Sequence, residues 1–240
     1  MNIAVIFAGG TGQRMNTKSK PKQFLEIHGK PVIIYTLDNF QNHPLIDGIV
    51  VVCLQSWIPY CQKIISKFGI SKVKAIVPGG QTGQDSIFHG IQKSCELFGE
   101  NTILLIHDGV RPLIDESTIT HCIETVKEKG NAITVSPAIE TIFEKQDGSN
   151  KVGRIMRRSQ CMMAKAPQCF WAKDIYKAHL LAIRDNKTDF IDSADLMQHY
   201  GFKLFMVEGA ADNIKITTPS DFYTFRAIMD ARESYQILGL

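Results

Sequence analysis

The feature that most constrains this chain is its first segment, where an apolar strand leads straight into glycines and then into basic residues. Ala4–Phe7 (Ala-Val-Ile-Phe) is uncharged and partly β-branched, which is typical of a buried strand. Ala8–Met15 (Ala-Gly-Gly-Thr-Gly-Gln-Arg-Met) and then Pro21–Phe24 (Pro-Lys-Gln-Phe) follow it. The small residues leave backbone N–H groups open to a ligand, and Arg14 and Lys22 add positive charge beside them. This order predicts an anion-binding loop at the end of a buried strand.

Two common phosphate-binding loops do not fit this segment. A P-loop would end in Gly-Lys-Ser/Thr, and no such string follows the glycines. The dinucleotide-binding loop of an oxidoreductase would need a third glycine where Met15 stands, and an acidic residue after the second strand, where the chain has Val51–Leu54. An ordinary glycine turn before a helix explains the glycines equally well, but it explains Arg14 and Lys22 less well.

Length and composition indicate a globular chain with a sizeable core. The 240 residues are 44% hydrophobic and 21% charged, which is typical of a soluble protein, and we expect a single domain over residues 1–240. The net charge of +3 is too small to indicate nucleic-acid binding, and no apolar stretch has the length of a membrane span. The first residues, Met1-Asn2-Ile3, lack a basic segment and lead directly into a strand, so we expect no signal peptide. The six cysteines form no Cys-x-x-Cys pair, so we expect free thiols and a cytoplasmic location.

Strand-like and helix-like stretches alternate along the chain, which predicts an α/β fold. The expected strands are Ile3–Phe7, Ile49–Leu54, Lys74–Val77, Thr102–Ile106, Asn131–Val135 and Phe202–Val207. The expected helices are Pro31–Asn42, Ile58–Phe68, Gln84–Leu97, Glu116–Lys129, Lys173–Arg184, Asp192–Tyr200 and Pro219–Glu233. Such alternation favours a mostly parallel sheet with helices on both faces, and ligands of these sheets bind at the carboxyl ends of the strands.

Residues 137–170 interrupt this alternation. Two short β-prone segments, Thr141–Glu144 and Val152–Met156, flank Asp147-Gly148, which is a hairpin signal. We expect an arm that projects from the domain over about residues 137–170. An exposed β-arm needs a partner to cover it, so the arm predicts a dimer.

Two further loops follow predicted strands. Val77–Ser86 (Val-Pro-Gly-Gly-Gln-Thr-Gly-Gln-Asp-Ser) leads into a helix near Gln84, with Asp85 or Ser86 as its N-terminal cap, although an ordinary capped loop explains it equally well. His107–Pro112 (His-Asp-Gly-Val-Arg-Pro) follows an apolar strand. Its aspartate can hold a divalent ion or substrate hydroxyls and its arginine can bind a phosphate. The alternative is a turn with a surface Asp–Arg pair.

Three more segments carry polar groups at expected strand ends. Glu140-Thr141 lies at the base of the arm, and Arg157-Arg158 lies on its return. In Val207–Pro219, Lys215 stands between Ile214 and Ile216, so on a strand its ammonium would face away from both isoleucines. Asp192–Asp195 is explained by the start of an acidic helix.

In this order, from about Ile3 to Asp221, the segments resemble the motifs of nucleotidyltransferases that make activated sugars and polyols. They are most similar to the cytidylyltransferases of the methylerythritol-phosphate and ribitol-phosphate type. The resemblance implies a Rossmann-like fold of the nucleotide-diphospho-sugar transferase type, and a homodimer formed through the arm. Two positions depart from the family pattern, because Gly83 stands in place of an arginine and Ala166, within Lys165-Ala166-Pro167-Gln168, in place of a threonine.

The resemblance also implies a role for each matching residue. Arg14 and Lys22 would neutralise the triphosphate of CTP, while Arg158, from across the dimer interface, and Lys215 would hold the attacking phosphate. The acceptor would also contact Asp108, Arg111 and Thr141, and Asp108 would lie near a Mg²⁺ ion or another divalent cation. The CTP-binding residues would be Phe7, Ala8, Gly9 and Gly10 in the first loop and Gly79, Gly80, Gln81, Thr82, Gly83, Gln84, Asp85 and Ser86 in the second.

The activity implied by the resemblance is transfer of CMP from CTP to a polyol phosphate, with release of pyrophosphate. Ala-Gly-Gly at residues 8–10 and Val110-Arg111-Pro112 favour ribitol 5-phosphate, for the synthesis of wall or capsule polymers. Methylerythritol 4-phosphate, for isoprenoid synthesis, is the second candidate. A non-catalytic nucleotide-binding protein of the same fold, or one of the NAD type, is a more remote alternative.

Overall fold

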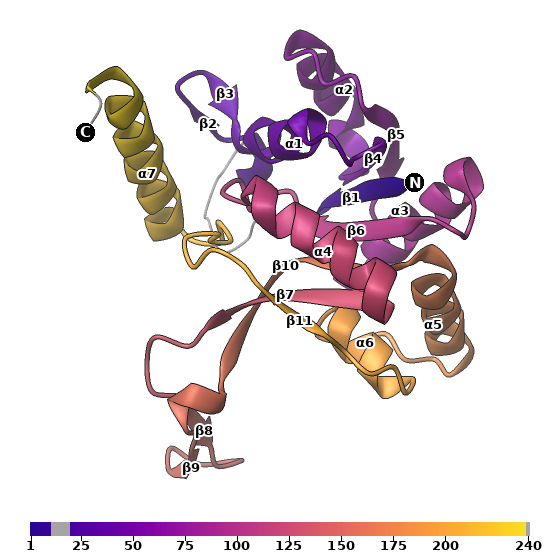
Figure 1. The fold of residues 1–240 in the computed structure, drawn as a ribbon, viewed down its shortest axis with the longest axis vertical. Coiled ribbons are helices and arrows are strands. Elements are labelled where there is room, and N and C mark those ends of the chain that lie inside the picture. The colour runs from indigo at the N-terminus through magenta and orange to yellow at the C-terminus, as the bar shows by residue number, and fades with distance from the viewer. Residues whose placement is uncertain (11–19, 239–240) are drawn as a thin grey trace.

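A computed structural model describes residues 1–10 and 20–238 of the chain, with side chains to residue 235. Its centre is a seven-stranded sheet (Figure 1). In sheet order the strands are β11 (Met206–Glu208), β7 (Asn131–Pro137), β10 (Met162–Trp171), β6 (Ile103–Asp108), β1 (Asn2–Ala8), β4 (Gly48–Cys53) and β5 (Val73–Pro78). β10 is antiparallel to both of its neighbours, and the other adjacent pairs are parallel. The predicted mostly parallel α/β sheet is therefore confirmed.

The register of the central strands brings the predicted motifs to one edge of the sheet. Phe7 of β1 pairs with Asp108 of β6, and Ala8 pairs with Cys53 of β4. Because these strands are parallel, the glycines after β1, the loop after β5 and the string after β6 all leave the sheet at its carboxyl edge.

Helices cover both faces of the sheet, as the alternation predicts. The helices are α1 (Val32–Asn42), α2 (Ile58–Lys67), α3 (Gly83–Phe98), α4 (Glu116–Lys129), α5 (Ala172–Arg184), α6 (Ser193–His199) and α7 (Pro219–Leu238), with short 3-10 turns η2 (Lys22–Phe24), η3 (Gln55–Trp57) and η4 (Arg158–Gln160). One buried apolar cluster joins α1, α2 and α4 to one face, and a second joins α3, α5 and α6 to the other. None of the helices in the described ranges is both long and apolar enough to cross a membrane.

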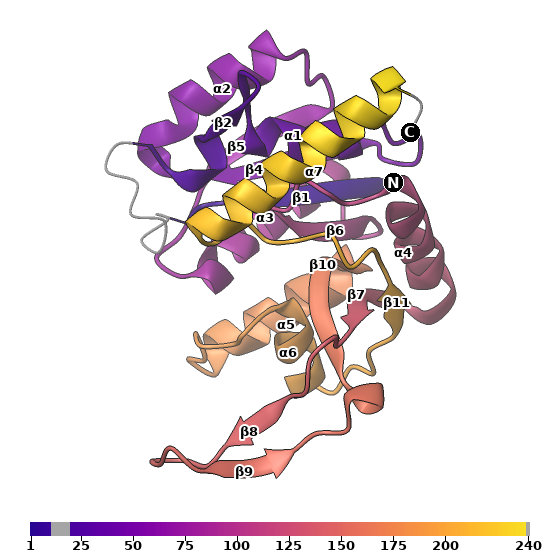
Figure 2. The same cartoon turned by 90° about the vertical axis from the view of Figure 1, so that its left-hand side faces the viewer.

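A third apolar cluster fixes the C-terminal part of the chain. Ile216 and Phe225 of this part pack against Val110 and Val32, next to the small hairpin of β2 (Glu26–Ile27) and β3 (Lys30–Pro31). α7 lies across this side of the molecule (Figure 2). The cluster holds residues 213–216 beside the end of β6, because the Ile216 N–H donates to the Val110 carbonyl at 2.9 Å.

The last predicted strand is shorter in the structure than Phe202–Val207. Only Met206–Glu208 pairs with β7. The side chain of Asn131 binds the preceding residues instead, since it donates to the Lys203 carbonyl at 2.8 Å and accepts from the Phe205 N–H at 3.0 Å. Side-chain hydrogen bonds thus replace the strand ladder over this stretch.

The arm is also shorter than the predicted range 137–170. The hairpin is present, with β8 (Phe143–Lys145) antiparallel to β9 (Val152–Ile155), and it projects away from the sheet (Figures 1 and 2). Residues 162–171, however, form β10 inside the sheet. Pro167 lacks an N–H group and argues against a central strand, but a register shift between Ala164 and Gln168 accommodates it.

Candidate active site

The two glycine-rich loops meet around Ser86. The Ser86 hydroxyl accepts from the Gly80 N–H at 3.0 Å and donates to the Thr82 carbonyl at 2.9 Å. A Cβ added at Gly9 would lie 3.2 Å from this hydroxyl oxygen, and one added at Gly79 would lie 3.0 Å from it. The loop after β1 and the loop after β5 therefore share one wall, which only small residues allow to form.

The second loop is held by a capping box at the start of α3. The Thr82 hydroxyl accepts from the Asp85 N–H, the Asp85 carboxylate accepts from the Thr82 N–H, and both distances are 3.0 Å. The cap is therefore Thr82, with Asp85 as its reciprocal partner, rather than Asp85 or Ser86 alone. The positive end of the α3 dipole points to the same edge of the sheet as the glycines.

The segment that carries Lys22 packs against the end of β1. The buried amide of Gln23 donates to the Ala8 carbonyl at 2.7 Å and more weakly to the Gly10 carbonyl at 3.4 Å. η2 is thereby placed beside the first loop, and Lys22 is half-buried there. Arg14 lies outside the described residues.

A buried carboxylate links two of the predicted cations. Asp108 Oδ1 lies 2.6 Å from the Lys215 ammonium, and Oδ2 accepts from Arg111 Nε at 3.0 Å. Asp108 and Arg111 are buried, whereas the Lys215 side chain is 40% exposed. Burial alone would raise the pKa of Asp108, but the Lys215 ammonium and the Arg111 guanidinium outweigh it, so the pKa lies below its ordinary value.

Lys215 reaches this position without the predicted strand. Residues 209–217 carry no strand pairing, and the segment is held by contacts to its neighbours. Arg111 Nη1 donates to the Asn213 carbonyl at 2.8 Å, and the Asn213 amide donates to the Ala166 carbonyl at 2.9 Å. Ile216 is fully buried, so the alternation predicted around Lys215 persists without a ladder.

Lys165 is a further cation at this site, to which the sequence analysis gave no role. The register shift in β10 carries it, and its ammonium donates to the Ala211 carbonyl at 3.2 Å. Burial and the nearby Arg111 guanidinium lower the pKa of Lys165, and the Asp212 carboxylate offsets this lowering only in part. No signal in the sequence indicated this role, because Lys165 lies in the expected arm and reaches the pocket only when β10 enters the sheet.

These groups line a pocket of about 440 Å³. Its walls come from the ends of β1 and β6, the start of α3, the shifted part of β10, α5 and the segment before α6. The lining includes seven of the predicted site residues: Phe7, Thr82, Gly83, Gln84, Asp108, Arg111 and Lys215. It also includes residues without a predicted role, among them Lys165, Ala166, Gln168, His179 and Asp192.

Gln168 and Asp192 form one side of this pocket. The Gln168 amide donates to Asp192 Oδ2 at 2.8 Å and its carbonyl oxygen accepts from the Ala194 N–H at 2.9 Å. Asp192 also caps α6, because its Oδ1 accepts from the Asp195 N–H at 2.9 Å. The acidic helix start expected from Asp192–Asp195 is thus part of the pocket wall.

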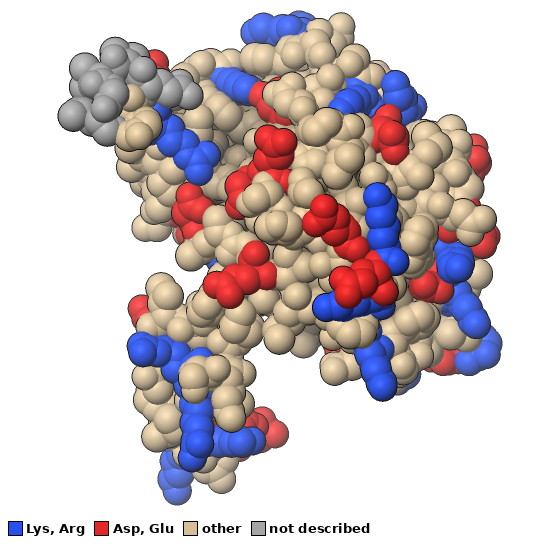
Figure 3. Space-filling model, viewed as in Figure 1, with Lys and Arg blue, Asp and Glu red and all other residues tan. Residues whose placement is uncertain are grey.

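The two predicted residues of the arm do not reach the pocket of their own chain. Thr141 and Arg158 are exposed, and Arg158 Nη1 makes a long hydrogen bond of 3.4 Å to the Ile139 carbonyl. Lys and Arg side chains gather on the projecting arm (Figure 3). The arm also exposes apolar side chains, namely Ile139, Phe143, Val152 and Ile155.

The donor set around Asp108 does not resemble a resident metal site. Among residues 1–10 and 20–238, no group of three or more His, Cys, Asp or Glu side chains could hold a metal ion. Both oxygens of Asp108 are engaged by Lys215 and Arg111. A single carboxylate is nevertheless enough for a Mg²⁺ ion that takes most of its ligands from substrate phosphates and water.

Comparison with known proteins places this chain in a family. Residues 2–231 match the sequence profile of the family described as IspD, 2-C-methyl-D-erythritol 4-phosphate cytidylyltransferase. The chain is 51% identical to ribitol-5-phosphate cytidylyltransferase of Streptococcus agalactiae serotype V over 240 residues, which is 100% of both chains. It is 37% identical to 2-C-methyl-D-erythritol 4-phosphate cytidylyltransferase of Clostridium acetobutylicum over 233 residues, covering 95% of this chain and 97% of the relative.

A solved structure agrees with these matches. The crystal structure of 4-diphosphocytidyl-2C-methyl-D-erythritol synthase from Anaerococcus prevotii superposes with a TM-score of 0.81 and 26% identity. The match covers 95% of each chain. The fold is therefore shared over nearly the whole length of both chains.

Proposed function

Because this chain belongs to the 2-C-methyl-D-erythritol 4-phosphate cytidylyltransferase (IspD) family, we propose that it transfers CMP from CTP to a polyol phosphate, with ribitol 5-phosphate as the preferred acceptor. The relative at 51% identity is named for ribitol 5-phosphate, whereas the relative at 37% is named for methylerythritol 4-phosphate. The observation that carries the proposal is the convergence of Arg111, Lys165 and Lys215 on one pocket next to the two glycine-rich loops.

In this reaction an oxygen of the acceptor phosphate attacks the α-phosphorus of CTP. A new P–O bond forms to the acceptor, the bond to the β-phosphate breaks, and pyrophosphate leaves with the electron pair. The attacking oxygen is already anionic, so no general base is required. The difficulty is the approach of two anions, which fixed cations and backbone N–H groups reduce.

The nucleotide occupies the surface formed by the two loops. Backbone groups of Gly9, Gly10, Gly79 and Gly80 border it, and Ser86 fixes the distance between the loops. Lys22 on η2, and Arg14, act on the triphosphate and on the charge that develops on the leaving group. The start of α3 adds its dipole to this environment.

The acceptor phosphate occupies the pocket beside Asp108. Arg111 and Lys215 are oriented by this carboxylate, and Lys165 adds a third cation whose partner is a neutral carbonyl. A phosphate dianion fits this set, because the pocket lining carries three cations and two carboxylates, Asp108 and Asp192, which leaves an excess of positive charge. Mg²⁺ or another divalent cation, bound with CTP, would supply further positive charge to the phosphoryl oxygens, and Asp108 is the carboxylate that would hold it.

The arm supplies the rest of the acceptor site in a homodimer. The exposed apolar side chains Phe143, Val152 and Ile155 suit burial against a second copy. Arg158 and Thr141 would then act in the pocket of the partner subunit, since they lie away from the pocket of their own. All six cysteines are free thiols, which fits a cytoplasmic enzyme.

The test is a pyrophosphate-release assay with CTP and Mg²⁺ over ribitol, glycerol, erythritol and methylerythritol phosphates. We expect ribitol 5-phosphate to give the highest kcat/KM. A higher value with methylerythritol 4-phosphate would transfer the assignment to that acceptor, which the 37% relative and the solved structure keep as the second candidate. No release with any acceptor, or faster release with ATP, GTP or UTP, would refute the proposal.

A further inference from the structure

Two buried polar atoms on the α3–α5 side of the pocket have no hydrogen-bond partner among the described residues. They are the side-chain oxygen Oε1 of Gln84 and the ring nitrogen Nε2 of His179. Both residues line the same pocket as Lys165, Arg111 and Lys215. Buried polar atoms are almost always paired with protein groups or ordered water, so two unpaired atoms on residues of one pocket indicate that a polar group, from a ligand or from water, binds there.

The orientation of the Gln84 amide is fixed by a neighbouring loop. Its Nε2 donates to the Lys187 carbonyl at 2.9 Å. This contact leaves Oε1 as an unpaired acceptor on a residue that lines the pocket, and such an acceptor can take a hydrogen bond from a donor of the ligand.

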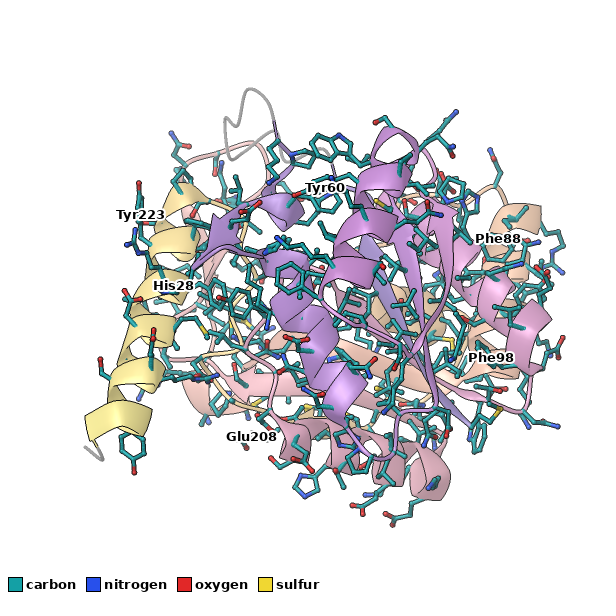
Figure 4. The ribbon with its side chains drawn as sticks, turned by 90° about the horizontal axis from the view of Figure 1, so that it is seen from above. His28, Tyr60, Phe88, Phe98, Glu208 and Tyr223 are labelled. Carbon is teal, nitrogen blue, oxygen red and sulfur yellow. The ribbon has the colours of Figure 1, made fainter. Side chains whose placement is uncertain are left out.

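His179 is held by aromatic rings and is neutral at physiological pH. It is 2% exposed, and its ring stacks on Phe88 of α3 at a centroid distance of 5.4 Å, while Phe88 stacks in turn on Tyr176 at 5.7 Å. Figure 4 shows Phe88 on the side of the molecule where α3 and α5 lie together. Burial lowers the pKa of His179 to about 4, with a smaller opposing effect from Asp85, so Nε2 can donate or accept a hydrogen bond without carrying charge.

The surroundings of these atoms match a hydroxylated carbon chain. Ile87, Phe190 and Leu196 line the pocket together with Gln84 and His179. Apolar side chains suit C–H groups, and a hydroxyl group can donate to Gln84 Oε1 or pair with His179 Nε2 in either direction. The cations come from other walls, namely the loop after β6, β10 and residues 213–216, so the pocket has a phosphate side and a hydroxyl side.

We propose that Gln84 and His179 bind hydroxyl groups of the polyol chain of the acceptor and thereby select acceptors long enough to reach them. For Gln84 this role replaces the CTP-binding role that the resemblance implies, because its side chain lines the pocket that holds Lys165, Arg111 and Lys215. This inference rests on the proposed function, and it assigns the two residues to the specificity of that reaction. A five-carbon alditol phosphate places hydroxyls well beyond its phosphate, whereas the three carbons of glycerol 3-phosphate end closer to the cations.

The experiment compares the wild-type enzyme with His179→Phe and Gln84→Met in the pyrophosphate-release assay. Phenylalanine keeps the ring stacking on Phe88 and removes both nitrogens, and methionine keeps the shape of Gln84 without its acceptor. We expect the KM for ribitol 5-phosphate to rise about tenfold or more in each variant, with the KM for CTP unchanged within about twofold. The kcat/KM for glycerol 3-phosphate should change much less, so the selectivity between the two acceptors should fall.

His121→Phe serves as the control, because His121 is exposed on α4 away from the pocket. Gln84 is only half-buried, so Gln84→Met tests the inference even if His179→Phe folds poorly. Variants that lose thermal stability but keep the wild-type selectivity would overturn the inference, since the two atoms would then bind structural water only. A wild-type enzyme inactive with every alditol phosphate would overturn the proposed function as well, so the two failures are distinguishable.

Discussion

Among single residues, Asp108 orders the charged groups of the pocket, and its removal should affect folding as well as activity. In Asp108→Asn the buried Arg111 loses its carboxylate partner at 3.0 Å. Removing one partner of a buried ion pair leaves an uncompensated charge, so we expect a loss of about 3 kcal/mol in the free energy of unfolding, measured by urea denaturation. Asp185→Asn, which changes a carboxylate on the surface, should leave the stability almost unchanged.

Because of Lys165, catalysis with the acceptor should weaken at high pH. The pKa of Lys165 is lowered by burial and by Arg111, so the ammonium loses its proton at a lower pH than a lysine in water. We expect kcat/KM for the acceptor to fall as pH rises through that pKa, and Lys165→Arg to move this fall to higher pH because arginine stays charged. Lys165→Met should raise the KM for the acceptor about tenfold at neutral pH. The same alkaline limb in wild type and Lys165→Arg would contradict this role.

Two buried histidines should make the fold sensitive to acid. The pKa of His107 and the pKa of His179 are both lowered from 6.5 to about 4, mainly by burial. Between these pH values the unfolded chain binds protons that the folded chain does not. The contribution of the two neutral histidines to the free energy of unfolding is therefore fully present above about pH 6.5 and is lost as the pH falls towards 4. The difference corresponds to about 3 kcal/mol per imidazole. His107→Gln should remove about half of this pH dependence in urea titrations at pH 7 and pH 4.5, whereas His121→Gln should not.

At the scale of secondary-structure elements, the start of α3 and the second loop behave as one unit. A Cβ added at Gly80 would lie 2.2 Å from the Asp85 Cβ, so Gly80→Ala must displace the loop or the helix end. Either movement breaks the bond from Gly80 to Ser86 and weakens the capping box. We expect the KM for CTP to rise about tenfold or more and the stability to fall by about 1 kcal/mol, measured by steady-state kinetics and urea denaturation.

Gly83→Ala is the matched control for the stability part of this prediction. A Cβ at Gly83 meets nothing within 4 Å, and alanine favours the first turn of a helix. Its stability should therefore equal or exceed that of the wild type. An equal loss of stability in both variants would show that the crowding at Gly80 is not the cause.

The elements that the sequence predicted well are those whose structure depends on local pattern. The helix over Glu116–Lys129 has the bounds expected from its spacing, and the strand before Ala8 is buried as its composition indicates. β10 could not be found in this way, because Pro167 and Lys165 interrupt its apolar pattern and its pairing partners, β6 and β7, are distant in sequence. The pocket wall that β10 builds was missed for the same reason.

At the scale of the whole molecule, the candidate site is predictable where motifs follow parallel strands and not where remote segments meet. Asp108 is the last residue of β6 and Arg111 comes three residues after it, so sheet topology alone brings them next to the first loop. His179 and Lys165 reach the pocket only through the packing of α5 on α3 and the shift in β10. Thr141 and Arg158 are a third case, because one chain does not bring them to its own pocket at all.

The arm therefore leads to a prediction about subunits. If Arg158 acts in the partner's pocket, then Arg158→Ala and Lys215→Ala each inactivate both sites of their own homodimer, for different reasons. A mixed dimer contains one site with Lys215 from one subunit and Arg158 from the other, and this site is complete. Random mixing after dissociation gives about half mixed dimers, and each of these has one complete site of two. We therefore expect about a quarter of the wild-type activity to return.

Pyrophosphate release before and after mixing measures the recovery. The control is Lys215→Ala mixed with Asp108→Asn, which should stay inactive because both changes affect the same side of the interface. No recovery, with mixed dimers verified by differently tagged subunits, would place Arg158 in the site of its own chain or outside the reaction.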